Sequence, residues 1–86
     1  MKTQEEKLLE EMGTIRVMAK GKVTPIRTAK NGRTYYSLQE HRDGRNMTRY
    51  VPEGKLEAVR AATANYKRFM GLVARYVALC ESRLDL

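Results

Sequence analysis

The 86-residue sequence has one cysteine, Cys80, no tryptophan and two prolines. A single cysteine cannot form an intrachain disulfide or supply the cysteine cluster of a structural zinc site. No apolar run approaches the roughly 20 residues that a membrane-spanning helix needs. The first residues are rich in glutamate, unlike the apolar core of a signal peptide. We therefore expect one small cytoplasmic domain spanning residues 1–86, with no cofactor, no metal and no membrane partner.

A long stretch of the chain, between Glu11 and Glu40, contains no acidic residue. Residues 14–52 carry nine basic and two acidic side chains, so this segment alone matches the net charge of +7 of the whole protein. Positive charge concentrated in one segment attracts polyanions more strongly than the same charge spread evenly. Nucleic acid is therefore the first partner to consider, and a merely solubilising basic surface is the alternative.

Groups suited to catalysis are also scarce. His41 is the only histidine, and aspartate occurs only at positions 43 and 85. So few groups cannot provide a nucleophile, a base and an orienting residue in one pocket, and we expect no enzymatic activity. His41 stands near Glu40 and Asp43, but alternating side chains and an exposed turn argue against a metal site there.

The clearest local pattern predicts a β-hairpin over residues 34–51. Two segments rich in Tyr, Thr, Val and Leu flank Asp43-Gly44, a pair typical of two-residue hairpin turns. With these two residues in the loop, Leu38 pairs with Arg49 on a mostly core-like face. A three-residue loop would shift one strand and mix the faces. In the first register the opposite face carries Tyr35, Ser37, Gln39, His41, Asn46, Thr48 and Tyr50.

Two further segments precede the hairpin in the predicted α+β fold. Residues 22–28 read as an edge strand, because Pro25 cannot donate a ladder hydrogen bond. Residues 3–12 have the composition of a short helix. The following residues, 14–19, fit either a helix or a strand, and we favour a helix that continues to about Met18. The expected units are thus a helix over 3–18 and a basic antiparallel sheet over 22–51.

A long amphipathic helix is predicted over residues 53–84. Some 30 helical residues make a rod of about 45 Å, whereas strands of six or seven residues span only about 20–23 Å. The half beyond residue 70 must therefore bury its apolar stripe against the N-terminal helix, a second copy of the chain or another protein. Heptad spacing is held by Leu56, Val59, Thr63, Tyr66, Met70, Val73, Val77, Cys80 and Leu84. We place an oligomer interface at Met70, Val73, Val77, Cys80 and Leu84.

Candidate nucleic-acid-binding residues lie in and around the hairpin. Basic side chains near the turns suit phosphates, Gln39 and Asn46 have the amide geometry that reads adenine, and Tyr35 and Tyr50 could stack on unpaired bases. An ordinary solvent-facing strand surface and cross-strand tyrosine packing are the alternatives. The full set is Lys22, Arg27, Lys30, Arg33, Tyr35, Gln39, Arg42, Arg45, Asn46 and Tyr50.

Residues 32–80 resemble a group of small uncharacterised prokaryotic proteins with a GPYYxL/TxRYVP hairpin and an NYRRF-like helix. The Gly-Pro of that pattern is Arg33-Thr34 here, and residues 27–32 replace its cysteine-rich knuckle. The resemblance therefore implies the hairpin and the helix, and neither a metal nor a function. The matching segments are Tyr35-Tyr36-Ser37-Leu38, Thr48-Arg49-Tyr50-Val51-Pro52 and Asn65-Tyr66-Lys67-Arg68-Phe69.

Two functional hypotheses follow from these patterns. The first is a non-enzymatic module that binds nucleic acid, duplex DNA rather than RNA, through the basic sheet and its turns. A small antiparallel sheet backed by a helix is similar to the strand-reading DNA-binding modules of some recombinases, an analogy of fold alone. The alternative is an interaction or assembly module that forms a homodimer, or docks on a larger protein, through the C-terminal helix.

Overall fold

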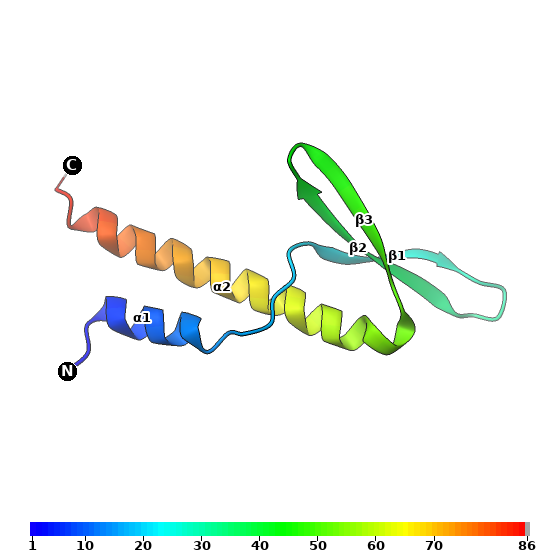
Figure 1. The fold of residues 1–86 in the computed structure, drawn as a ribbon, viewed down its shortest axis with the longest axis horizontal. Helices are drawn as coiled ribbons and strands as arrows, with labels where there is room; N and C mark the ends of the chain where they lie inside the picture. The colour runs from blue at the N-terminus through cyan, green and yellow to red at the C-terminus, as the bar shows by residue number, and fades with distance from the viewer. Residues whose placement is uncertain (86) are drawn as a thin grey trace.

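A long helix joins two different ends of the molecule, one helical and one formed by a sheet (Figure 1). The computed structural model describes residues 1–85, and its Cα trace extends over 59 × 30 × 16 Å. The elements in order are α1 (Gln4–Gly13), β1 (Lys22–Thr28), β2 (Thr34–Arg42), β3 (Arg45–Val51), the 3₁₀ turn η1 (Glu53–Lys55) and α2 (Leu56–Ser82). The predicted α+β class, with its short first helix, small sheet and long last helix, is confirmed.

The hairpin of β2 and β3 has the predicted two-residue loop. Asp43 and Gly44 both have positive φ, +53° and +77°, as a primed turn requires. Arg42 pairs with Arg45 beside this loop, and Leu38 pairs with Arg49 further along. The register predicted from the Asp-Gly pair is therefore correct, and so is the division of side chains between the two faces.

Strand β1 lies at the edge of the sheet, which has the order β1-β2-β3, as Pro25 predicted. Its pairing with β2 shifts between Pro25 and Arg27, so Ile26 is an extra residue opposite no partner. Such a bulge moves every following side chain to the other face of its strand. Arg27 is thereby paired with Tyr35 instead of facing α2.

Helix α1 begins at an N-cap formed by Thr3 and ends earlier than predicted. The Thr3 hydroxyl accepts the Glu6 backbone N–H, a pattern that satisfies one of the unpaired N–H groups of the first turn. The helix ends at Gly13, so our prediction that it continues to about Met18 is wrong.

Residues 14–20 instead form an extended connection that is held by α2. The Ala19 N–H donates to the Ala62 carbonyl at 3.1 Å, and the Asn65 side-chain amide donates to the Val17 carbonyl at 3.0 Å. These bonds replace those that a continued helix would have supplied. β-branched residues in this stretch lower its helix propensity further.

Helix α2 has different neighbours along its two halves. Around its C-terminal half, Leu72 is 4% exposed and packs with Leu8 and Met12 of α1 and with Ile15. The residues Phe69, Val73, Tyr76 and Leu79 border this cluster. Around its N-terminal half, the sheet and the 14–20 connection cover the buried Ala62. The hydrophobic core is thus split into two small parts along one helix.

Candidate nucleic-acid interface

The sheet has one face toward α2 and one face away from it. Arg60 of α2 lies over the Tyr36 ring, and Leu38 lines a groove with Val59 and Ala62. Because directly paired residues of an antiparallel sheet point to the same side, the register assigns the remaining side chains to the opposite face. We call that opposite side the open face. Its members are Lys22, Thr24, Arg27, Tyr35, Ser37, Gln39, His41, Asn46, Thr48 and Tyr50.

An aromatic and cationic cluster occupies the end of the open face near the β1–β2 turn. The Arg27 guanidinium lies 5.2 Å from the centre of the Tyr35 ring, within the range of a cation–π contact. The Tyr35 and Tyr50 rings are 6.4 Å apart and tilted by 39°. The two tyrosines therefore pack against each other across the strands, which was the alternative to base stacking.

Hydrogen-bonding groups fill the rest of the open face. Ser37 is fully buried between larger neighbours, and its hydroxyl is 3.4 Å from that of Thr24. Nearer the hairpin tip, His41 Nδ1 lies 3.0 Å from Asn46 Oδ1. Gln39 is exposed between these two pairs. A shallow depression of about 440 Å³ lies here, lined by Lys22, Gln39, Glu40, His41, Asn46 and Thr48.

The open face contains no carboxylate side chain among its ten members. Of the two acidic residues of the basic middle segment, Asp43 lies in the hairpin loop and Glu40 points to the other face. The Glu40 side chain is only 5% exposed and pairs with Arg42 at 3.3 Å and with Arg49 at 3.8 Å. This one carboxylate is shared by two cations on the side toward α2, and the open face has no acid of its own to offset Lys22 and Arg27.

The structure brings together six of the ten predicted binding residues. Lys30 and Arg33 lie in the β1–β2 turn beyond the open face, and Arg33 is paired with Glu53. Arg42 and Arg45 flank the hairpin loop as expected, but they point to the side of α2. On the open face are Lys22, Arg27, Tyr35, Gln39, Asn46 and Tyr50.

Sequence reasoning left four open-face residues out of the binding set, and one of them, Ser37, is fully buried. Thr48 was assigned to the correct face but not to the site, and its pairing with Gln39 places it at the centre. Thr24 belongs to β1, whose register against β2 no turn residue specifies. His41 was considered only as a metal ligand, and its contact with Asn46 follows from the hairpin register. The hairpin register alone could have identified three of these four.

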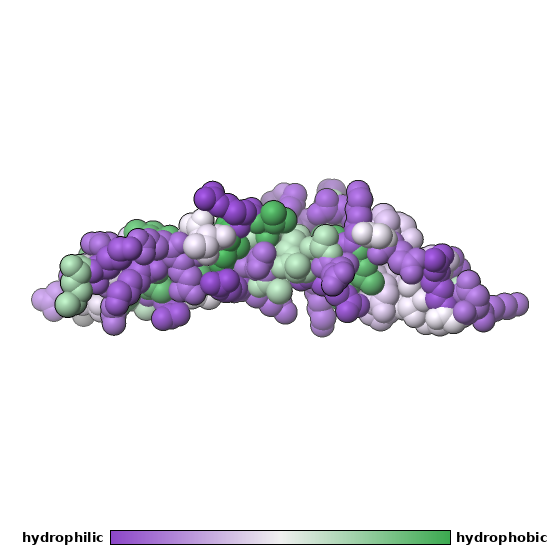
Figure 2. Space-filling view, turned by 90° about the horizontal axis from the view of Figure 1, so that it is seen from below, coloured by the Kyte–Doolittle hydropathy of each residue, from purple (hydrophilic) through white to green (hydrophobic). Residues whose placement is uncertain are grey.

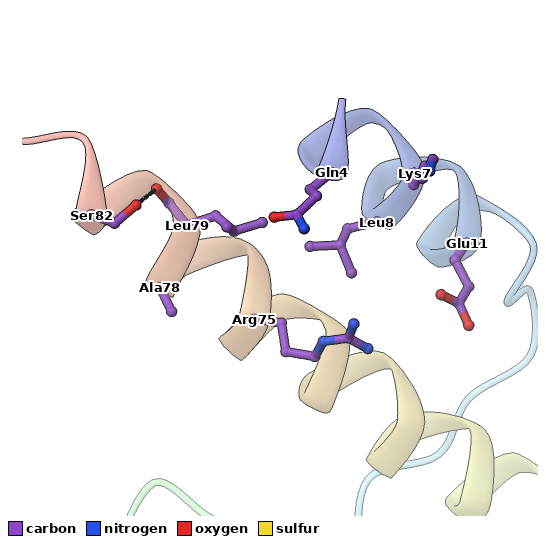
Figure 3. A pocket seen from close by; sticks show the side chains of 8 residues that line it. All are labelled: Gln4, Lys7, Leu8, Glu11, Arg75, Ala78, Leu79 and Ser82. Carbon is purple, nitrogen blue, oxygen red and sulfur yellow. Dashed lines mark hydrogen bonds between the residues drawn. The ribbon is translucent and has the colours of Figure 1, made fainter. Parts of the chain in front are cut away.

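The helical end has a cleft of about 620 Å³ between α1 and α2 (Figure 3). Leu8 and Leu79 point toward one another across it, and Lys7 points away. Salt bridges link the two ends of α1 to α2, from Glu11 to Arg68 at 3.1 Å and from Glu5 to Arg83 at 2.6 Å. The lining combines aliphatic, amide, hydroxyl and charged groups, without a nucleophile beside a base. This cleft is a packing gap between two helices and does not resemble an active site.

Residues 1–85 contain no candidate metal site and no helix suited to span a membrane. No group of three or more His, Cys, Asp or Glu side chains is placed to hold a metal ion in this part of the chain. Neither described helix is long and apolar enough to cross a membrane. Comparison with protein-family models, curated proteins and solved structures gave no match. The open face is therefore interpreted from its own chemistry.

Proposed function

We propose that the protein is a non-enzymatic nucleic-acid-binding module that contacts duplex DNA through the open face of its sheet. The observation that supports this most is the composition of that face. It combines Lys22 and Arg27 with amide, hydroxyl and imidazole groups and has no carboxylate. Cations suit phosphates, and amides suit base edges, so both kinds of contact that a nucleic-acid-binding surface needs are present on one side.

The shape of the sheet favours a duplex. Three strands about 4.8 Å apart span roughly 10 Å, and the major groove of B-DNA is about 12 Å wide. A sheet that enters the groove with its open face leading would present Gln39 at its centre. An amide side chain can bond to the N6 and N7 atoms of adenine. Lys22 on the edge strand would then lie near a phosphate backbone.

The tyrosines favour a duplex over unpaired bases. A base-stacking platform needs an accessible ring face. Here Arg27 lies over Tyr35, and Tyr50 packs against the same ring from the neighbouring strand. Tyr50 is 57% exposed, but it is tilted by 39° to Tyr35, so the two rings form no flat platform for successive bases. The cluster positions the Arg27 cation at one end of the open face.

The position of the sheet leaves the open face accessible to a large ligand. The N-terminus and the end of α2 lie at the helical end, and α2 backs the opposite face of the sheet (Figure 1). The end that carries the sheet shows mainly hydrophilic residues, and the hydrophobic residues gather nearer the middle (Figure 2).

A binding screen with a salt titration tests the proposal. Duplex DNA, single-stranded DNA and RNA are compared at low salt, and each hit is titrated with salt. Neutralising two phosphates, one by Lys22 and one by Arg27, predicts a log–log slope of about −2 for the duplex. Stronger binding to single-stranded DNA or to RNA would mean that this nucleic acid, and not the duplex, is the ligand. Binding to all three that is undetectable or independent of salt would reject the proposal.

A matched pair of variants tests which face binds. Gln39→Glu adds one negative charge to the open face, and Met47→Glu adds one to the opposite face, at a side chain that is 44% exposed. The two variants have the same total charge, so the long-range electrostatic attraction between protein and DNA falls by the same amount in both. We expect Gln39→Glu to weaken duplex binding on the order of tenfold more, because its carboxylate also meets base edges or phosphates directly. Equal losses would contradict the assignment of the open face.

A further inference from the structure

The face of α2 on which the sheet packs continues beyond the sheet without a cover. Met70 and Val77 are seven residues apart and lie on one side of α2, and Leu84 follows just after the last helical residue, Ser82. The three side chains are 43%, 45% and 62% exposed. Val73 and Cys80 lie between them and are half-buried. We call these five residues the α2 seam.

Neither neighbour of α2 covers Met70 or Val77, although Val73 borders the cluster that α1 forms around Leu72. Val59 belongs to the same heptad stripe and lines the groove between α2 and the sheet, so the sheet occupies only the N-terminal part of this face. Helix α1 lies beside the C-terminal half but packs on Leu72. At 100° per residue, Leu72 is 200° from Met70 around the helix, almost on the opposite side. Met70 and Val77 therefore meet solvent, and the half-buried Val73 lies at the border between this stripe and the side that α1 covers.

The chain exposes more surface than a compact monomer of its mass. The accessible surface is 6962 Å², whereas a folded monomer of this mass has about 5,200 Å². The Cα radius of gyration is 17.6 Å, against about 12 Å for a compact chain of this length. The excess of roughly 1,750 Å² is larger than the roughly 800 Å² that each partner contributes to a stable interface.

We propose that a second copy of the chain covers the α2 seam, with the two α2 helices antiparallel. A parallel pair would place the two sheets against each other, because each sheet lies on the seam side of its own helix. An antiparallel pair centred near Arg75 separates the sheets to opposite ends. In that register Met70 of one copy packs on Cys80 of the other, and Val73 packs on Val77.

The charges beside the seam fit this same register. Lys67 and Glu81 are exposed and lie 14 residues apart along one flank of the seam. Antiparallel pairing places Lys67 of each copy opposite Glu81 of the other, with Ala74 between them at the two-fold axis. The other flank is apolar, because Phe69 and Tyr76 lie there beside α1. Such self-complementarity favours a second copy over an unrelated partner.

Sedimentation equilibrium without nucleic acid tests the dimer, so its outcome does not depend on the proposed function. We expect twice the monomer mass of 9.9 kDa. Val77→Asp should give a folded monomer, because the residue is exposed within one chain, and Ala78→Asp, one position round the helix, should remain a dimer. A wild-type chain that stays monomeric over a wide concentration range overturns the proposal, as does a Val77→Asp variant that dimerises as tightly as wild type.

A charge exchange tests the orientation. Lys67→Glu and Glu81→Lys each replace two attractive pairs by repulsive ones, and each should raise the dimer dissociation constant on the order of tenfold. The double variant restores opposite charges and should return it to near the wild-type value. Circular dichroism of every variant separates loss of pairing from loss of folding. If the double variant instead loses the sum of the dimer affinities that the two single variants lose, the antiparallel register is wrong.

Discussion

The Arg27 guanidinium lies above the Tyr35 ring because Ile26 is an extra residue in β1. Without this bulge Arg27 would be opposite Thr34, and its side chain would point to the other face of the sheet. The register shift therefore decides whether the open face has one cation or two. Arg27 is the one of the two that has an aromatic neighbour to hold it.

Arg27→Ala should weaken duplex binding and reduce the magnitude of the salt slope by about one. The matched control is Arg45→Ala, which removes the same charge from the opposite face. Fluorescence anisotropy at several salt concentrations measures both affinity and slope. Equal changes in the two variants would mean that only the total charge matters, and that Arg27 makes no specific phosphate contact.

The buried carboxylate of Glu40 predicts an asymmetry in stability. Glu40→Gln removes one charge and leaves Arg42 and Arg49 free to be hydrated, since their side chains are 59% and 67% exposed. Arg42→Ala combined with Arg49→Ala instead leaves a carboxylate that is 5% exposed without its cations. We expect the double variant to lose about 1–3 kcal/mol of unfolding free energy and Glu40→Gln to lose less. Urea unfolding measures both, and the reverse order would contradict the structural role of the pair.

Two glycines should respond in opposite ways to alanine. Gly21 has φ +125°, and an added Cβ would lie 2.6 Å from the Gln39 carbonyl oxygen. Gly21→Ala should therefore separate β1 from β2 and lower the thermal midpoint. Gly71 lies inside α2 with nothing within 4 Å of an added Cβ, so Gly71→Ala should stabilise the chain by up to about 1 kcal/mol. Thermal unfolding followed by circular dichroism measures both shifts, and shifts of the same sign would be inconsistent with this geometry.

Adjacent leucines in α1 test the docking of that helix. Leu8 is 6% exposed in the cluster around Leu72, whereas Leu9 is 50% exposed. Leu8→Ala should cost about 2–3 kcal/mol, at the low end for a buried leucine because the core is small. Leu9→Ala should change the unfolding free energy by less than about 0.5 kcal/mol. Similar losses at both positions would show that α1 does not pack through Leu8.

The sequence predicted those parts of the fold that local chemistry specifies. Asp43-Gly44 determined the hairpin register, Pro25 placed β1 at the edge, and the heptad stripe identified α2. Tertiary contacts determined the rest. The end of α1 at Gly13 depends on hydrogen bonds that α2 supplies to the following residues, such as the one from Ala19. No local sequence pattern predicts those hydrogen bonds.

The candidate site was predictable to the extent that it depends on the hairpin. The register placed Gln39 and Asn46 on one face from the sequence alone, and the structure agrees. The placement of Arg27 on that face could not be predicted, because the bulge at Ile26 arises where β1 pairs with β2. Arg42 and Arg45 were included on the basis of charge, whereas the alternation of the strands assigns them to the other side.

The most direct test of the open face as the binding surface is an NMR titration of the isotopically labelled protein with a short DNA duplex. Side-chain amide resonances of Gln39 and Asn46 report from the open face, and the methyl resonances of Met47 and Val59 report from the side toward α2. We predict saturable shifts of the two amides together with Tyr35 and Tyr50, and little change at the two methyl-bearing residues. Shifts confined to Met47, Val59 and their neighbours, with the open face unchanged, would contradict the account.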